Sequence, residues 1–334
     1  MGRENFYDLT SFFMMTLGQI YERSKELAIQ RGPRSRKDID ERFKKLRDEY
    51  KKLDEKKKKY FDEESLTNPY LDSRIEFGDP KTPLKRVMVG IDISVGEILL
   101  AHELSKSGKK IDAVIAHHPE GRALIDLTQV MDLQEDIAVQ DGVPINVAEK
   151  LMKTRITDLN RALHPHDHYQ VPQAAKLLNM PLACFHTFAD NQCWWFLKNF
   201  IGKKKPRYVH DIVDALMELP EYQHAKKMGN GPMVFSGSDD SRVGKISYSG
   251  FTGGTSGSKE IYAQMAAAGV GTLLAMHIPD EHRKLAEKHH LNVVITGHMA
   301  SDSLGVNLLM DELARKKVEI LECGGFIRVS RAGK

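Results

Sequence analysis

The chain has 334 residues, of which 41% are hydrophobic and 28% charged. This composition excludes wholesale disorder and predicts one large domain or two ordinary ones. Lys and Arg number 49 against 46 Asp and Glu, a formal net charge of +3, so we expect no nucleic-acid partner. Cys184, Cys193 and Cys323 are too scattered for a disulfide framework, which indicates a reducing compartment.

The N-terminal region does not have the pattern of a signal peptide. Its apolar residues 12–15 are flanked by acidic and polar residues. No apolar run in the sequence approaches the roughly 20 residues that cross a bilayer. We therefore expect a cytoplasmic protein with no membrane segment.

Residues 34–64 are dense in Lys, Arg, Asp and Glu and contain no Gly or Pro. Apolar residues recur there at alternating steps of four and three, the pattern of an amphipathic helix or short coiled coil. They are Ile39, Phe43, Leu46, Tyr50 and Leu53. We expect residues 1–84 to form a charged helical extension, which is either an oligomerisation or partner-binding arm or a solvated helix lying on the body.

From about residue 85, short apolar runs alternate with helical patterns. The runs are Val87–Ile93, Ala113–Ala116, Leu182–Phe185, Met233–Phe235, Ile246–Tyr248, Thr272–Met276, Val293–Thr296 and Val318–Leu321. The helical patterns are Val95–Ser107, Ile145–Lys153, Trp194–Phe200, Ser258–Ala268, Pro279–His289 and Asp302–Lys316. This alternation predicts an α/β fold with a largely parallel sheet. We expect α/β halves at residues 85–202 and 233–331, joined by a connector at 203–232 that begins with a basic, Pro-containing stretch.

Histidines follow three of the predicted strands directly. The strand-end residues are His117, His118, His186, Asp190, His298 and Asp302. Ligands of open α/β sheets collect beyond the carboxyl ends of the strands, so we expect these side chains at one edge. Neutral imidazole and carboxylate form the ligand set of Zn, Fe, Mn and similar divalent ions.

The spacing within these groups allows more than one interpretation. His298 and Asp302 are four residues apart, which puts them on one face if the turn is helical. His117 and His118 point apart on an extended backbone, which suits two ions, or one ion and a supporting contact. Taken singly, each group also fits a turn, a buried core histidine or a helix cap. Their joint occurrence at one sheet edge favours a metal site.

Two further segments carry polar groups. His164, His166 and His168 follow no apolar strand, so we interpret them as a surface loop or as an accessory wall of the site that shuttles protons. The glycine-rich residues 249–258 lie between a strand and a helix, where backbone N–H groups can cradle phosphate. This loop lacks the Gly-Lys-Ser/Thr ending of a nucleotide-binding P-loop. A tight strand-to-helix turn explains its glycines almost as well.

These motifs, in this order, resemble the Nif-three-like family of dinuclear-metal-centre hexameric proteins, often labelled GTP cyclohydrolase 1 type 2 homologues. The resemblance runs from about residue 85 to 331 and leaves residues 1–84 uncovered. The matching segments are Val87–Ser94 (opening strand), Ile115–Pro119 (paired histidines), His186–Asp190 (His-Thr-x-x-Asp), Ser249–Ser258 (glycine-rich start of the second half) and Gly297–Asp302 (Gly-His-x-x-x-Glu).

The resemblance implies a fold, an assembly and a ligand set. Two similar α/β halves would form one body, and six chains would form a toroidal hexamer with sites facing a central cavity. Carried over by position, it implies two divalent ions, Zn, Fe or Mn, held by His117, His118, Asp190, His298 and Asp302. The family's last ligand is a Glu that bridges both ions, whereas Asp302 is one methylene shorter.

The function that we expect is that of a metal-dependent, hydrolase-like protein in which metal-activated water attacks a small-molecule substrate. A nucleotide or other phosphoester is the first candidate substrate, and a cyclic C–N compound is the second. The alternative is a non-catalytic metal-handling protein, such as a metallochaperone or insertase, or a regulatory protein, with the same metal site. A third possibility is a scaffold whose metals are structural.

Overall fold

The computed structural model describes residues 14–333. Phe12, Phe13 and the rest of residues 1–13, which begin the expected helical extension, lie outside the described residues. No helix in the described part is long and apolar enough to cross a membrane.

The first part of the chain builds one sheet and its helices. Its elements are α1 (Leu17–Arg31), α2 (Arg36–Lys51), α3 (Glu55–Lys58), the 3-10 helix η2 (Glu63–Leu66), β1 (Ser73–Phe77), β2 (Arg86–Gly90), α4 (Val95–Lys106), β3 (Ala113–Ala116), α5 (Gly121–Ile125), the 3-10 helix η3 (Asp126–Val130), α6 (Leu133–Gln140), α7 (Ile145–Leu163), α8 (Gln170–Leu177), β4 (Leu182–Phe185) and α9 (His186–Lys204).

The second part builds another sheet and returns to the first. Its elements are α10 (Val209–Leu216), α11 (Pro220–Lys227), β5 (Met233–Ser236), β6 (Lys245–Gly250), α12 (Ile261–Ala267), β7 (Val270–Ala275), α13 (Asp280–Lys288), β8 (Asn292–Ile295), α14 (His298–Ala314) and β9 (Glu319–Cys323). Residues 203–232, expected as a connector, therefore carry the two helices α10 and α11.

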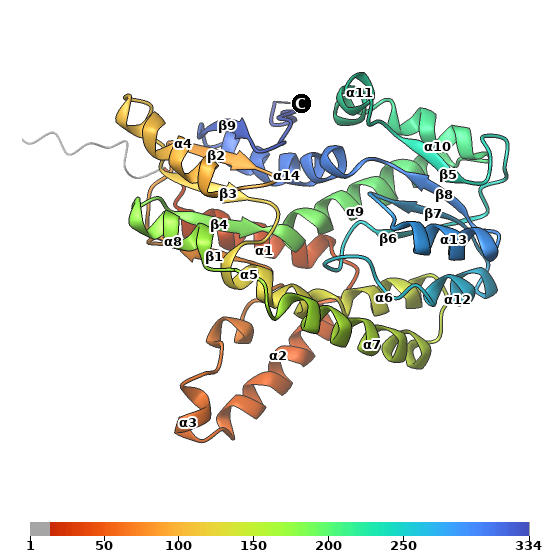
Figure 1. Cartoon of the computed structure of the whole chain (residues 1–334), viewed down its shortest axis with the longest axis horizontal. Coiled ribbons are helices and arrows are strands. Elements are labelled where there is room, and N and C mark those ends of the chain that lie inside the picture. Colours follow the sequence, from red (N-terminus) through yellow and green to blue (C-terminus); the bar gives the residue numbers. More distant parts are fainter. Residues whose placement is uncertain (1–13, 334) are drawn as a thin grey trace, which may run out of the picture.

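The strands form two separate sheets, which lie at the two ends of the molecule in Figure 1. The first has the order β1-β4-β3-β2-β9, and the second has the order β5-β8-β7-β6. All neighbours are parallel except β1 against β4 and β5 against β8. The buried runs of β2, β3, β4 and β8 fit sheets that helices cover on both faces. The α/β class predicted from the sequence is confirmed.

The two halves repeat one topology. In each, an edge strand comes first in the chain and pairs antiparallel with the third of the three parallel strands that follow it, and the first sheet adds β9 as a fourth parallel strand. That third strand, β4 or β8, leads at once into a long helix, α9 or α14. Because strands β2–β4 and β6–β8 follow the same order, α9 and α14 occupy equivalent positions in the two halves.

Helices α9 and α14 pack against each other between the two sheets (Figure 1). The contact is tight at Gly305, where an added Cβ would lie 2.4 Å from the carbonyl oxygen of Ala189. Residues 186–194 of α9 are all buried. A helix surrounded in this way buries polar as well as apolar side chains, which allows it to carry functional groups into the interior.

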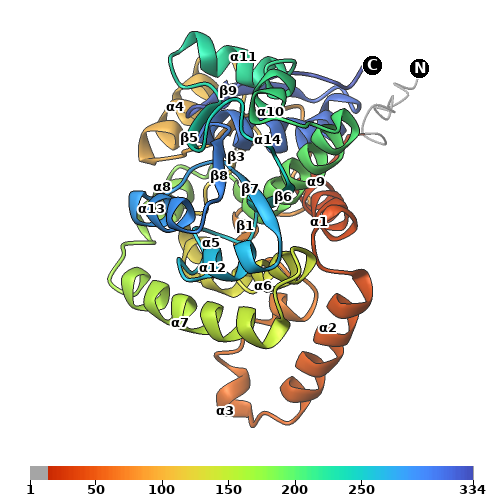
Figure 2. The ribbon, with the colours of Figure 1, turned by 90° about the vertical axis from the view of Figure 1, so that its right-hand side faces the viewer.

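The described residues of the 1–84 segment belong partly to the body. Helix α1 packs against α9 and buries Leu17, Ile20 and Leu27, while β1 is the edge strand of the first sheet. Helices α2 and α3 project from the body (Figures 1 and 2), although Ile39 and Phe43 of α2 are buried against it. The arm-like part is therefore α2 and α3.

Candidate metal centre

The paired histidines continue strand β3 for two residues beyond its end. The backbone N–H of His117 donates to the carbonyl of Gly90, and that of His118 donates to the carbonyl of Ile91, both at 2.9 Å. This extended backbone separates the two rings, whose centroids are 5.2 Å apart. His117 is buried and His118 is partly exposed.

The other predicted residues lie on the first turns of α9 and α14. His186 and Asp190 are four residues apart on α9, and His298 and Asp302 are four apart on α14, so each pair shares a helix face. Gly297 precedes α14 with a φ of 102°, a backbone conformation that glycine adopts without the strain of a Cβ. The equivalent helices thus bring two similar His-x-x-x-Asp pairs to the centre of the molecule.

Asp302 lies at the middle of the cluster. Its Oδ1 is 3.4 Å from Nε2 of His117. Its Oδ2 is 3.4 Å from Nε2 of His118 and also 3.4 Å from Nε2 of His298. Both oxygens are buried, and neither accepts a hydrogen bond from any described residue. A buried carboxylate without donors is costly unless a positive charge compensates it.

A second group adjoins the first through His117. The Nε2 atom of His117 is 3.4 Å from Oδ1 of Asp190, and Nε2 of His186 is 3.7 Å from Oδ2 of Asp190. The three residues His117, His186 and Asp190 can hold a metal ion, and so can His117, His118 and Asp302. Sequence reasoning placed His186 at the strand end, but the ligand set implied by the family resemblance did not include it.

The electrostatics of the two carboxylates differ. Burial disfavours the charged form of Asp302, but the imidazoles of His117 and His118 outweigh burial and hold its pKa well below the usual range. Burial raises the pKa of Asp190 to about 8, although the neighbouring His186 acts against the rise. Asp190 is therefore a buried acid with too little positive charge around it, as expected for a cation ligand.

Two carboxylates that the sequence analysis missed orient the histidines. Oδ1 of Asp92 is 2.7 Å from Nδ1 of His118, and Oδ2 of Asp72 is 2.7 Å from Nδ1 of His186. Each contact leaves Nε2 of the ring facing the cluster. Asp92 comes two residues after β2, a strand-end signal like the others, whereas Asp72 precedes β1 in the segment interpreted as an extension.

A fourth strand-end imidazole, His277, was also missed. It comes two residues after the end of β7, and its ring centroid is 4.7 Å from that of His298. By contrast, His164, His166 and His168 are near the surface, and none of them belongs to the cluster or lines the pocket beside it. Geometry gives their predicted proton-shuttle role no support.

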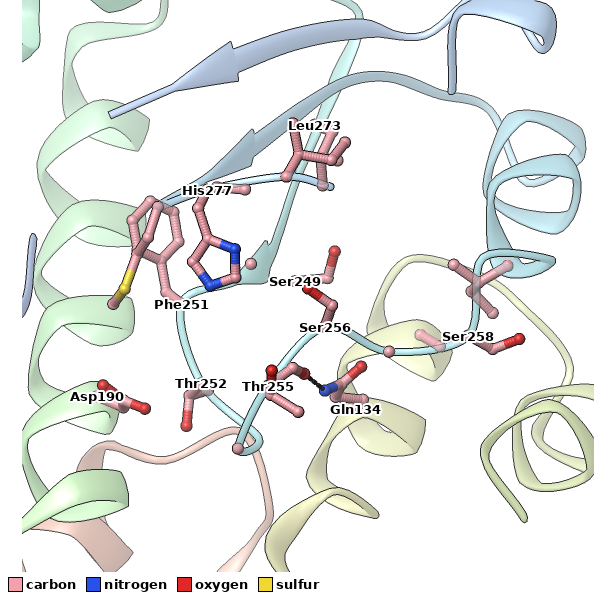
Figure 3. Close-up of a pocket in the computed structure, with 18 of the residues that line it drawn as sticks. Gln134, Asp190, Ser249, Phe251, Thr252, Thr255, Ser256, Ser258, Leu273 and His277 are labelled. Carbon is pink, nitrogen blue, oxygen red and sulfur yellow. Dashed lines mark hydrogen bonds between the residues drawn. The ribbon is translucent and has the colours of Figure 1, made fainter. Parts of the chain in front are cut away.

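A pocket with a cavity volume of about 90 Å³ lies beside the cluster. His186, Asp190, His298 and Asp302 line it from α9 and α14, and the glycine-rich residues 249–258 line it from the second half. Figure 3 shows this loop crossing the pocket between Asp190 and Ser258, with His277 above it.

Backbone conformation and close packing explain why glycine occupies three positions of the loop. Gly253 and Gly254 have φ values of 90° and 83°, and a Cβ on Gly257 would lie 2.0 Å from Oε1 of Gln134. The turn and the close approach to α6 therefore account for these three glycines.

No family model matches the chain, and no curated protein matches it. Among solved structures, a NIF3 superfamily protein from Sphaerobacter thermophilus is 30% identical, covering 78% of this chain and 94% of that one, with a TM-score of 0.67. HcgD from Methanocaldococcus jannaschii, in its reduced form, is 16% identical over 75% and 88% of the two chains, with a TM-score of 0.43. A Bacillus cereus protein related to NIF3 is 12% identical over 77% and 93%, with a TM-score of 0.40.

The likeness to the Sphaerobacter protein extends over nearly all of that protein and reaches 30% identity. The family resemblance found in the motifs is thereby confirmed. The chain belongs to the NIF3 superfamily.

Proposed function

We propose that the chain binds two divalent metal ions around Asp302 and uses them to hydrolyse a small-molecule substrate. The observation that carries the proposal is the state of the Asp302 carboxylate. Both of its oxygens are buried without a hydrogen-bond donor, and each is 3.4 Å from an imidazole nitrogen.

These distances fit metal ligands better than direct hydrogen bonds. Two ligands of one tetrahedral ion, each bound at about 2.0–2.1 Å, lie about 3.3 Å from each other. The three imidazole contacts of Asp302 are all 3.4 Å. Imidazole nitrogen with carboxylate oxygen is the donor set of Zn, Fe or Mn.

The two oxygens of Asp302 suggest how two ions would be shared. His118 and His298 face Oδ2, so they would hold one ion with it. His117 faces Oδ1 and also Oδ1 of Asp190, so these groups would hold the other. Asp302 would then bridge both ions despite being shorter than the family's Glu, and His186 would be a further ligand beside Asp190.

Two such ions would supply Lewis-acid chemistry, activating water and polarising an oxygen of the substrate. The chain's own residues would orient the histidine ligands and hold the substrate. Asp92 and Asp72 hold the Nδ1 side of His118 and His186, which keeps their Nε2 atoms directed at the cluster. The pocket walls would bind the substrate and exclude bulk water.

Access from the pocket favours a reaction over a purely structural role for the ions. The His298 side chain is 39% exposed and that of His118 is 26% exposed, whereas the Asp302 side chain between them is fully buried. Structural zinc sites are closed by four protein ligands, while catalytic sites keep a position open.

The test is hydrolysis by metal-loaded protein, with bis(p-nitrophenyl) phosphate and dihydrouracil as the phosphoester and cyclic-amide probes. We expect turnover of at least one probe in the wild type and a loss of at least about 100-fold in His118→Ala. The control His164→Ala removes an exposed histidine outside the cluster and should retain full activity.

The outcomes also distinguish the proposed hydrolase from the rival metal-handling function. Metal-dependent turnover that His118→Ala leaves unchanged would contradict the assignment of the site. Tight metal binding without turnover of either probe, together with transfer of the metal to an apo-acceptor, would contradict the hydrolase and favour a metallochaperone or insertase.

We also propose, from the family resemblance, that the chain assembles as a toroidal hexamer. Helix α4 exposes Val95, Leu99 and Leu100, an apolar surface of the kind that contacts between subunits cover. Light scattering of the eluting protein should give about six times the mass of one chain. A mass equal to one chain would contradict the proposal.

A further inference from the structure

A carboxylate outside the metal cluster lines the same pocket. Asp141 follows helix α6 and is only 6% exposed. Its Oδ2 accepts the hydroxyl hydrogen bond of Ser247, and Nζ of Lys245 donates to its backbone carbonyl rather than to the carboxylate. Oδ1 accepts no hydrogen bond from the described residues, so one oxygen of a buried acid is left for a ligand.

The glycine-rich loop lines the same pocket and offers hydrogen-bond donors. Three of its carbonyls are already used, because Gln134 donates to those of Gly253 and Thr255, and Arg155 donates to that of Ser256. The backbone N–H groups of residues 252–257 donate to no other described residue. The side chains of Ser249, Ser256 and Ser258 add hydroxyls to the same wall (Figure 3). The loop is therefore held in place through its backbone carbonyls, and its backbone N–H groups remain available to a ligand.

Much of the remaining lining near Asp141 is apolar. Among the residues that line the pocket there is no Lys and no Arg. Met152, Met265 and Met276 form flexible apolar walls that can adapt to a flat ring. An ionised phosphate has only acceptor oxygens to present to Oδ1 of Asp141, whereas a ring N–H supplies the donor that this oxygen lacks.

We propose that this pocket binds an uncharged cyclic amide, whose ring N–H donates to Oδ1 of Asp141 and whose carbonyl oxygen accepts from the loop at residues 252–257. Such a ring carries a donor and an acceptor on adjacent atoms and an apolar face for the methionines. The proposal deepens the proposed function and rests on it in one respect, because the metal pair would act on the bound ring. It selects the cyclic C–N class of substrate over the phosphoester class.

The test is binding of uracil and hypoxanthine to the metal-loaded full chain, measured by calorimetry. We expect at least one of them to bind saturably. In Asp141→Asn, which preserves the side-chain shape and the bond from Ser247, the Kd should rise at least about tenfold, the loss expected for a hydrogen bond to a charged group. The control Asp214→Asn removes an exposed carboxylate of α10 and should leave the Kd unchanged.

A ligand-side control covers a loss of folding in the variant. 1,3-Dimethyluracil keeps the ring but lacks both N–H groups, so it should bind wild type at least about tenfold more weakly than uracil. The proposal is overturned if neither uracil nor hypoxanthine binds, if Asp141→Asn binds as wild type does, or if methylation has no effect. Tighter binding of inorganic tripolyphosphate than of uracil to Asp302→Asn, where the metal bridge is removed, would also overturn it.

The same variants distinguish failure of this proposal from failure of the metal site. Uracil should bind Asp302→Asn through Asp141 even where metal is lost. Asp141-dependent binding in a wild type that holds no metal would contradict the proposed hydrolase but support the ring site. Two bound metals without Asp141-dependent binding would contradict the ring site but leave the proposed metal site supported.

Discussion

At the scale of single residues, the contact between Asp92 and His118 decides which ring nitrogen faces the cluster. Nδ1 of His118 lies 2.7 Å from Asp92, so Asp92→Asn should permit the wrong tautomer and weaken metal binding by about 10- to 100-fold. Competition against a zinc chelator measures the affinity. Asp214→Asn is the matched control on the exposed face of α10, and equal losses in both variants would contradict the role of Asp92.

Asp141 should make the protein less stable than it could be. Burial raises its pKa to about 6 from an ordinary 3.8, so the folded state holds the proton more tightly than the unfolded chain does. Stability from this group is therefore lost as the pH rises from about 4 through about 6, because the buried carboxylate must ionise. Asp141→Asn removes the penalty, and the free energy of unfolding at pH 7.5 should rise by roughly 1–3 kcal/mol.

Urea unfolding at several pH values measures this effect. The gain of Asp141→Asn over wild type should be largest above pH 6 and should disappear near pH 4. A variant that is less stable than wild type at pH 7.5 would show instead that Asp141 serves the fold through Ser247. A group that reduces stability is retained most readily where it binds a ligand.

Sequence reasoning found the cluster because its members follow strands. His117, Asp190 and Asp302 are brought together as the strand-end pattern predicted, since both long helices start at the same kind of position in the two halves. Asp72 could not be found in this way. It reaches His186 only because β1, whose short sequence alternates charged and apolar residues, pairs with β4 at long range.

At the scale of elements, the contact between α9 and α14 sets the distance between the two halves of the cluster. A Cβ on Gly305 would lie 2.4 Å from the carbonyl oxygen of Ala189, so Gly305→Ala must push the helices apart. We expect a loss of about 1–3 kcal/mol in the free energy of unfolding, together with weaker metal binding. Guanidinium unfolding and metal titration measure the two effects.

Gly202 gives the matched control for this substitution. It lies in the exposed last turn of α9, and a Cβ there would meet nothing within 4 Å. Gly202→Ala should therefore leave stability unchanged or raise it by up to about 1 kcal/mol, because alanine favours a helix. A similar loss in both variants would contradict the argument from close packing.

The elements themselves were partly predictable. The strands β3 and β4 coincide with apolar runs, and such runs also mark β2, β7 and β8. The structure departs from the pattern in β1, whose Arg74 and Glu76 interrupt any apolar run, and in residues 203–232, which form α10 and α11. Both depend on packing against distant parts of the chain, which periodicity within one segment does not report.

At the scale of the whole molecule, we expect the body to need the N-terminal segment in order to fold. Helix α1 covers α9, and β1 closes the edge of the first sheet. Removal of residues 1–84 should therefore expose the core and give aggregated or unfolded protein, as circular dichroism would show. A folded, metal-binding fragment would contradict this and would make the segment a separable arm.

The central claim is that Asp302 joins two metal ions, and the number of ions per chain tests it most directly. The measurement is metal content by mass spectrometry after zinc loading and removal of free ions, on wild type and on Asp302→Asn. The account predicts about two ions per chain in the wild type and at most one in the variant. Equal numbers in the two proteins, or no bound metal in the wild type, would contradict it.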